Sequence, residues 1–347
     1  MQKIRTLLLP FSFLYGGILW LRNTLYNKGI FKSESQSVKT IAIGNISLGG
    51  TGKTPHIEYI LNLLQNKNLA VLSRGYGRKG NDTLTVTCTS TAAQVGDEPL
   101  QIARKFPNVK VVVDGNRLRG IAYIKKHYPE TEIILLDDAL QHRKLKAGLN
   151  ILLTTFDQPF TKDHYLPAGN LRDHKIRAKD ADMIVVTKCP ENLHDSQIDH
   201  LKKQLSKYCE HVVFDKIGYK KIVPLHSRDA KPIEDFGKVF LITGIAKPEF
   251  FRQQANAHFN VVKHFDFRDH YQFKETDVER FCNFIGSFAP GEIAALTTEK
   301  DAMRLLDFDS NLNHSLSPVY YWEIGVNFDG YKTDFDNLII DYAQRTR

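Results

Sequence analysis

The fifteen residues Ile41–Pro55, IAIGNISLGGTGKTP, combine a short apolar run, a glycine-rich turn and a Gly-Lys-Thr sequence. Glycines let backbone N–H groups close around phosphate oxygens, a following helix adds the positive end of its dipole, and lysine reaches the outer phosphates. The pattern G-x-x-x-x-G-K-[ST] is met except at its first position, where Ser47 replaces glycine. A chance Gly-Lys-Thr in an ordinary turn is the alternative, and four glycines directly after an apolar run disfavour it. The sequence predicts a nucleotide-binding loop made of Ser47, Leu48, Gly49, Gly50, Thr51, Gly52, Lys53 and Thr54.

Two carboxylates end a second apolar run, Ile133–Arg143, IILLDDALQHR. On a sheet that carries such a loop, an aspartate at the end of a strand lies where Mg²⁺ and its waters are held, and the Thr54 hydroxyl is a second ligand. Adjacent residues of an extended segment face opposite ways, so one of Asp137 and Asp138 would address the metal and the other the acceptor side. Capping of a helix N-terminus is the alternative role for this pair.

A third acidic motif, Gln94–Pro99 (QVGDEP), places Asp97 and Glu98 before a proline that would open a helix running to about Phe106. Acids in a first turn commonly do no more than complement the helix dipole. An acid here could also accept the proton of an attacking hydroxyl in phosphoryl transfer to an alcohol. Spacing alone favours the structural role.

Arginine and histidine recur in other polar loops. His270 lies beside Asp269 in DFRDHY, and a lone histidine is more often structural than catalytic. In TTEKD, Thr298 and Asp301 fit a helix-capping box, which we favour over contact with a nucleotide base. Arginines can bind phosphate through two hydrogen bonds, although most are merely solvated, and they occur in the glycine-containing loops SRGYGR (Ser73–Arg78), DGNRLR (Asp114–Arg119) and LPAGNLRD (Leu166–Asp173).

The elements that must position these residues alternate between apolar strands and helical stretches, which predicts an α/β fold with a mostly parallel sheet covered by helices. We expect a P-loop core at 34–215, a polar linker at 216–238 and a smaller second α/β domain at 239–347, with the site at their cleft. The predicted strands are Thr40–Ile43, Ala70–Leu72, Leu84–Cys88, Val109–Val113, Ile133–Leu136, Asn150–Leu153, Met183–Val186, Val239–Thr243, Phe259–Phe265, Glu292–Leu296 and Val319–Glu323.

The composition and net charge of the chain indicate which classes of molecule it could bind. The 347 residues carry a formal net charge of +8, which indicates an anionic partner such as nucleic acid, an acidic membrane surface or a phosphorylated substrate. No nucleic-acid recognition motif is present, so we expect no nucleic-acid partner. The four cysteines form no C-x-x-C pair, which argues against a disulfide framework or a zinc site and favours a reducing cytosol.

Residues 1–33 differ from the rest. Lys3 and Arg5 precede the apolar segment Leu7–Leu21, and Arg22 and Lys28 follow it. A helix of that segment would be about 22 Å long, too short for a hydrocarbon core of about 30 Å. Its aromatic residues and flanking bases favour a helix lying in the membrane interface over a cleaved signal peptide or a helix merely packed on the domain.

The ordered set GNISLGGTGKTP, SRGYGR, VGDEP, DGNRLRG, DDALQHR, LPAGNLRD, FRDHY and TEKD resembles the tetraacyldisaccharide 4′-kinase family of lipid A biosynthesis, from about Met1 to Arg304. Similar proteins carry a hydroxyl residue at the position of Ser47, and an N-terminal apolar helix on the cytoplasmic face of the inner membrane. Two departures occur: Ala139-Leu140 stands where many relatives have Gly-Phe, and Asp173 stands where glutamate is usual.

The resemblance implies Mg²⁺-dependent transfer of the γ-phosphate of ATP to the 4′-hydroxyl of an acylated disaccharide 1-phosphate lipid at the inner membrane surface, with no obligate protein partner. Lys53 would stabilise the β- and γ-phosphates, and Thr54 with Asp137 or Asp138 would hold the metal. Asp97 and His270 would act as a pair that takes the acceptor proton, brought together by domain closure. The expected substrate contacts are Arg74, Arg117, Gln141 and Arg172.

A second hypothesis is a membrane-docked nucleotide switch that acts on a protein partner. It would prefer GTP and hydrolyse it slowly without a small-molecule acceptor. The loops rich in arginine and histidine disfavour it, because a switch has no use for them.

Overall fold

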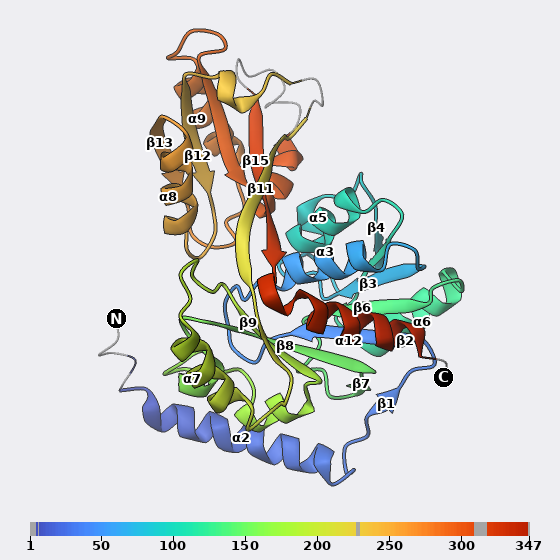
Figure 1. Cartoon of the computed structure of the whole chain (residues 1–347). Coiled ribbons are helices and arrows are strands. Elements are labelled where there is room, and N and C mark those ends of the chain that lie inside the picture. Colours follow the sequence, from blue (N-terminus) through green and yellow to red (C-terminus); the bar gives the residue numbers. More distant parts are fainter. Residues whose placement is uncertain (1–4, 6, 227–229, 309–317, 346–347) are drawn as a thin grey trace.

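The computed structural model describes residue 5 and residues 7–226, 230–308 and 318–345, so Lys3 lies outside the described part. Its larger sheet has the strand order β10-β9-β8-β2-β6-β3-β5-β4 and is parallel except for the β4–β5 pair (Figure 1). The strands are β2 (Lys39–Gly44), β3 (Leu69–Ser73), β4 (Leu84–Val86), β5 (Lys110–Val113), β6 (Ile133–Asp137), β8 (Leu149–Thr155), β9 (Met183–Thr187) and β10 (Val212–Phe214).

A second sheet has the order β11-β15-β14-β12-β13, and only the β11–β15 pair is antiparallel. A short parallel pair, β1 (Glu34–Ser35) with β7 (Leu145–Lys146), lies apart from both sheets. The second sheet consists of β11 (Lys216–Pro224), β12 (Lys238–Thr243), β13 (Val261–Asp266), β14 (Ile293–Thr298) and β15 (Val319–Asn327). The predicted α/β class with mostly parallel sheets is confirmed, whereas the boundaries of the proposed domains stay a prediction.

Helices connect the parallel strands. Up to Leu205 the helices are α2 (Leu9–Asn27), α3 (Lys53–Leu63), α4 (Ala92–Val95), α5 (Asp97–Lys105), α6 (Arg117–His127) and α7 (Asp195–Leu205). In the second half they are α8 (Glu249–His258), α9 (Glu275–Ile285), α10 (Glu299–Leu305) and α12 (Lys332–Gln344). The C-terminal helix α12 returns to lie along the larger sheet (Figure 1), where Tyr342 Oη donates to the Thr40 carbonyl at 3.1 Å.

The prediction of a polar linker over 216–238 is wrong for residues 216–224. These residues form β11, which pairs with β15 from Lys216 opposite Asn327 to Pro224 opposite Tyr320. The pairing satisfies backbone hydrogen bonds that an irregular linker would leave to water. The chain therefore passes from β10 of the larger sheet directly into an edge strand of the smaller one.

The alternation of side chains along β2 shows how the core is divided. Ile41 and Ile43 face one cluster, which also holds Ile57 and Ile60 of α3, whereas Ala42 between them faces another. The first cluster continues into the second sheet through Phe240 and Ile242 and into α12 through Phe335 and Ile339. The two sheets thus share one apolar core, which holds the nucleotide-binding side of the larger sheet against the smaller one.

Helix α2 packs on the larger sheet's side of the molecule with its small and polar residues. Ser12, Gly16, Leu19 and Asn23 are buried, whereas the large apolar side chains point outward, for example Phe13 at 77% and Trp20 at 59% exposure. A side chain at Gly16 would meet the Tyr165 ring at 2.9 Å, so the close approach requires glycine. In the described part of the chain no helix is long and apolar enough to cross a membrane.

Candidate active site

The phosphate-binding loop lies between β2 and α3. Gly49 and Gly52 have φ of +109° and +88°, a region that glycine enters at little cost. Asn45 Nδ2 donates to Thr51 Oγ1 at 2.9 Å and to the Gly49 carbonyl at 3.3 Å, which braces the loop from inside. Thr187 Oγ1 donates to the Thr51 carbonyl at 2.9 Å from β9. The loop is therefore held in shape by side chains before any phosphate arrives.

The conformation of this loop matches the predicted role of Ser47–Thr54. Gly52 caps α3, so Lys53 and Thr54 form its first turn, and backbone N–H groups at a helix N-terminus attract anions. Ser47 pairs with Leu171 in an isolated bridge, and Leu48 N donates to the Asn170 carbonyl at 2.7 Å. Thr54 is buried in that first turn, within the region where a phosphate-bound cation would sit.

Asp138 forms ion pairs with two basic side chains. It has φ of +50°, lies 3.9 Å from Lys53 Nζ, and accepts hydrogen bonds from Arg172, one of them at 2.8 Å. Burial raises the pKa of its carboxyl, but Lys53 and Arg172 outweigh burial and hold that pKa below its ordinary value. Asp138 thus stays ionised and fixes both cations near the loop.

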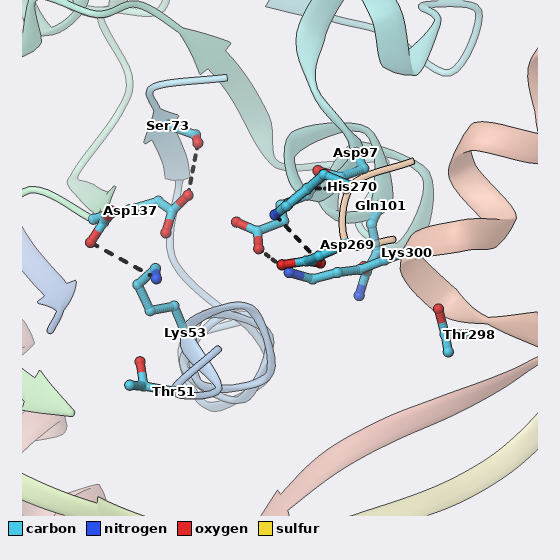
Figure 2. A network of polar contacts seen from close by, with 12 residues as sticks. Thr51, Lys53, Ser73, Asp97, Gln101, Asp137, Asp269, His270, Thr298 and Lys300 are labelled. Carbon is cyan, nitrogen blue, oxygen red and sulfur yellow. Dashed lines mark hydrogen bonds and ion pairs between the residues drawn. The ribbon is translucent and has the colours of Figure 1, made fainter. Parts of the chain in front are cut away.

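Asp137 ends the central strand β6 and is fully surrounded. Its Oδ2 accepts a hydrogen bond from Ser73 Oγ at 2.7 Å (Figure 2), while its buried Oδ1 has no partner among the described residues. Burial, followed by the nearby Glu98 carboxylate, raises its pKa to about 6. An orphaned carboxylate oxygen beside a phosphate loop fits a Mg²⁺ ligand, because that ion takes few protein ligands and keeps phosphate oxygens and water. The described residues hold no cluster of three or more His, Cys, Asp or Glu side chains for a metal.

The structure brings Asp97 and His270 together, although 173 positions separate them in the sequence. Asp97 Oδ2, in the first turn of α5, lies 3.4 Å from His270 Nδ1 in the loop after β13 (Figure 2). Burial alone would raise the pKa of Asp97, but its contacts with His270, Lys300 and Arg304 hold that pKa well below its usual range. The hydrogen bond with Asp97 raises the pKa of His270 above its ordinary value.

Arg304 is a residue of this site that sequence reasoning did not single out. It is 2% exposed, donates to Asp97 Oδ2 and to Asp301 Oδ1, and reaches the Gly244 carbonyl at 3.1 Å. Its Nη2 also lies 3.4 Å from His270 Nδ1. Arg304 therefore joins α10 to both members of the pair. Its only sequence signal is its place three residues after the TEKD motif.

The TEKD motif has the predicted capping geometry and one further contact. Thr298 is the N-cap of α10: its hydroxyl accepts from Asp301 N and donates to Asp301 Oδ2 at 2.7 Å, which is the capping contact without the reciprocal backbone bond of a full capping box. Lys300 of the same turn donates to the Glu98 carboxylate, next to Asp97. The first turn of α5 is thus joined to the first turn of α10 by the Lys300–Glu98 ion pair and to its last turn by the Arg304–Asp97 ion pair.

The expected substrate contacts differ in their exposure and in the hydrogen bonds that they make. Arg74 is exposed and has no hydrogen bond or ion pair within the described part of the chain. Arg117 is buried and donates to the backbone carbonyls of Asp114 and Asp137, and the Gln141 amide donates to the Asn45 carbonyl. These bonds support β6 and the loop, while Arg117 Nε has no partner among the described residues, so contact of Arg117 and Gln141 with substrate stays a prediction. Arg172 is partly buried against Asp138.

This arrangement is that of a P-loop kinase fold, in which a phosphate cradle and strand-terminal acids face a carboxylate–imidazole pair. A crystal structure of LpxK from Aquifex aeolicus, described as the "apo" form in complex with ATP, superposes with a TM-score of 0.76 at 28% identity, covering 99% of this chain and 100% of that one. The chain belongs to the Tetraacyldisaccharide-1-P 4'-kinase family, whose model matches residues 4–344.

Curated relatives agree with this assignment. A tetraacyldisaccharide 4'-kinase of Flavobacterium johnsoniae is 41% identical over 99% of this chain and 98% of its own length. One of Porphyromonas gingivalis strain W83 is 37% identical over 97% of each chain. The family predicted from the motifs is confirmed, and nothing in these comparisons supports the nucleotide-switch hypothesis.

Proposed function

We propose that this chain transfers the γ-phosphate of ATP to the 4′-hydroxyl of an acylated disaccharide 1-phosphate, giving the 1,4′-bisphosphate. Full-length membership in the kinase family supports the reaction, and the 3.4 Å contact between Asp97 and His270 is the observation that carries it. A kinase acting on an alcohol needs a group that takes the hydroxyl proton, whereas a nucleotide switch does not. The Glu98 carboxylate accepts a hydrogen bond from Lys300, which lies near Asp97, and its charge also raises the pKa of Asp137. The Asp97–His270 pair and the phosphate side of the site are therefore adjacent.

The phosphate side of the site binds and orients ATP. Lys53 reaches the β- and γ-phosphates from the first turn of α3, while Asp138 and Arg172 hold the lysine in place. We propose that Thr54 with Asp137 would hold Mg²⁺, which neutralises charge on the phosphates when bound. The unpaired Oδ1 of Asp137 is the atom that supports this assignment over Asp138, whose oxygens already have cationic partners.

The pair acts on the acceptor. The 4′-hydroxyl oxygen bonds to the γ-phosphorus as the bond to the bridging oxygen of ADP breaks, and the hydroxyl proton passes to the Asp97–His270 pair. Asp97 is buried and its pKa is lowered by His270, Lys300 and Arg304, so the pair holds the proton as an imidazolium beside a carboxylate. His270 is the more exposed member, as contact with an acceptor requires.

We further propose that the protein sits on the cytoplasmic face of the inner membrane as a peripheral or monotopic protein. Helix α2 turns its large apolar side chains outward, a pattern that suits a hydrophobic interface and not water. It is also bonded to the site: Tyr15 Oη donates to the Arg172 carbonyl at 3.3 Å, and Arg22 donates to the Gln141 carbonyl at 2.9 Å. Arg74, Arg117 and Arg172 are the candidates for contact with the 1-phosphate of the lipid or with the nucleotide, and Arg74 is the exposed one among them.

The first test is transfer of labelled γ-phosphate from ATP, with Mg²⁺ and detergent, to tetraacyldisaccharide 1-phosphate. We expect a doubly phosphorylated lipid from the wild type and none from Lys53→Ala, because the lysine charge on the phosphates is lost. Absence of the lipid product together with acceptor-independent GTP hydrolysis would contradict the proposal.

The catalytic pair has its own test. Asp97→Ala and His270→Ala should each lower kcat by about 100-fold or more, the scale of general acid–base catalysis, while ATP still binds. Binding is measured by titration calorimetry in the absence of lipid. If both variants turn over at a near-normal rate, Asp97 and His270 are not the proton-transfer pair.

A further inference from the structure

A second histidine, His56, lies fully buried in α3, one turn after the phosphate loop. Its Nδ1 lies 2.7 Å from the Gly52 carbonyl, and its Nε2 lies 2.8 Å from Asp215 Oδ2. Both side chains of the His56–Asp215 pair are 0% exposed. None of the catalytic steps above uses this pair.

The chemistry of the two partners fixes the protons. A backbone carbonyl accepts hydrogen bonds only, so Nδ1 carries a hydrogen that it donates to Gly52. A second proton lies between Nε2 and the Asp215 carboxylate, since two acceptor atoms at 2.8 Å would otherwise repel. The pair is thus a buried, charge-assisted contact whose other carboxylate oxygen, Asp215 Oδ1, has no partner among the described residues.

The partners of His56 lie where the chain crosses between the two sheets. Asp215 stands between β10 of the larger sheet and β11 of the smaller one, and a Cβ at Gly52 would meet Ile217 of β11 at 2.5 Å. The imidazole also packs edge-on against Phe328, 5.8 Å away, just after β15 ends. The residue before β11 and the residue after β15 therefore both contact His56 at the base of the phosphate loop, and these two strands pair with each other.

We propose that His56 is a positioning residue that ties the phosphate loop to the crossing between the two sheets. Its Nδ1 holds the Gly52 carbonyl away from the phosphates, so that the first N–H groups of α3 face them. Its Nε2 holds Asp215, which directly precedes the antiparallel pair β11–β15 of the second sheet. The connections of that sheet supply His270 and Arg304. One side chain thus couples the shape of the nucleotide-binding loop to the position of the Asp97–His270 pair.

The two nitrogens can be separated by substitution, because an asparagine amide can take the place of Nδ1 and a glutamine amide the place of Nε2. His56→Gln should keep the Asp215 contact, lose the Gly52 contact, and weaken ATP binding about tenfold, the equivalent of about 1.4 kcal/mol. The double variant His56→Asn with Asp215→Asn should bind ATP within about threefold of the wild type but lower kcat about tenfold at saturating ATP. ATP affinity is measured by calorimetry on the full chain in detergent without lipid.

A matched control comes from the same helix. Tyr59→Phe removes the 2.7 Å hydrogen bond from Tyr59 to Asp336, in the same aromatic cluster but without contact with the loop. We expect it to change neither ATP affinity nor kcat more than twofold. If Tyr59→Phe matches the effect of the His56 variants, or if His56→Gln binds ATP within twofold of the wild type, the proposal is wrong.

A variant that fails to fold must be distinguished from one that folds but has lost function. Thermal unfolding without nucleotide reports whether each variant is folded, and Asp215→Asn alone is the milder substitution if the His56 variants unfold. A folded Asp215→Asn protein with wild-type kcat would overturn the role of Nε2. The kcat readout rests on the proposed kinase reaction, whereas the ATP-affinity readout does not, so the failure of either idea can be told from the other.

Discussion

At the scale of single residues, the site depends on the buried carboxylate of Asp97, which contacts two side chains at once. Asp97 faces the imidazole of His270 and the guanidinium of Arg304 at once. The hydrogen bond with His270 and the charges of Lys300 and Arg304 hold its pKa low, where burial alone would favour the neutral acid. The same contact makes the imidazole easier to protonate. His270 is therefore the member of the pair whose charge changes near neutral pH.

This gives a pH-dependence prediction. The pair accepts a proton only when His270 is neutral, so kcat should rise with pH through a midpoint above the ordinary histidine value of about 6.5. In Asp97→Asn the main cause of the raised pKa is gone, and the midpoint of the remaining activity should fall toward about 6.5. The measurement is kcat between pH 5.5 and 9 at saturating substrates. An unchanged midpoint in the variant would show that another group titrates.

Sequence reasoning reached some of these residues and not others. Lys53 and Thr54 lie in a contiguous motif, and the resemblance paired Asp97 with His270 although spacing alone favoured a structural role for each. Ser73 and Arg304 act through contacts between segments far apart in the chain, which no local pattern encodes. Arg117 and Gln141 were predicted as substrate contacts, and the structure adds that each also donates to a backbone carbonyl.

At the scale of elements, one lysine joins four of them. Lys105 at the end of α5 lies 2.7 Å from Glu58 of α3, 3.0 Å from Glu299 of α10 and 3.8 Å from Glu323 of β15. The exposed Lys221 also lies 3.8 Å from Glu323, so three carboxylates share two cations and leave excess negative charge in a mostly buried place. Burial, followed by Glu58, raises the pKa of Glu299 to about 8, and burial also raises the pKa of Glu58.

The consequence is a stability that depends on pH. The folded state keeps a proton on Glu299 up to about pH 8, whereas the unfolded chain releases it near the ordinary pKa of 4.5, so the free energy of unfolding should fall as pH rises between these values. Glu299→Gln mimics the protonated acid, and its melting temperature relative to wild type should increase from pH 6 to pH 9, by about 2–4 °C for each kcal/mol.

A control of opposite sign is available for this measurement. Glu292 is solvated, and its hydrogen bond with Lys238 lowers its pKa, so Glu292→Gln should lower the melting temperature near neutral pH. Differential scanning fluorimetry across the pH range gives both results. A pH-independent difference for Glu299→Gln would mean that Glu299 is not the protonated member of the cluster.

The elements that sequence reasoning predicted best are buried parallel strands, because their continuous apolar runs show on both faces. Ile133–Leu136, for example, is fully buried in β6 and was predicted directly. Strand β11 was missed because it lies at a sheet edge, carries the exposed Lys220 and Lys221, and has a register shift between Tyr219 and Ile222 that interrupts the alternation.

At the scale of the whole molecule, the outer face of α2 is the largest departure from a water-facing surface. Its exposed apolar residues are Phe11, Phe13, Leu14, Ile18, Trp20 and Leu21, while its small residues pack inward. A surface helix of a water-soluble domain normally has the reverse arrangement. The structure thus shows a helix packed on the domain, and the interfacial position of its outer face stays a prediction.

The role of this face is testable with vesicles. Trp20→Ser should weaken binding of the protein to anionic vesicles by about tenfold, because burying a large apolar side chain contributes about 1.5–3 kcal/mol. Phe250→Ser, at a residue 52% exposed on α8, is the control and should leave binding unchanged. Co-sedimentation measures both variants. Equal loss of binding in the two would place the membrane contact elsewhere.

The inverted packing of α2 also bears on how the enzyme meets its substrate. The helix is joined by hydrogen bonds to the Arg172 and Gln141 loops, so a protein seated on a bilayer through α2 has its site fixed at the lipid surface. Encounters then take place in two dimensions, and the turnover rate should follow the mole fraction of substrate in the surface and not its bulk concentration. Adding inert detergent to mixed micelles at constant total substrate should therefore slow the reaction, in the manner of surface dilution.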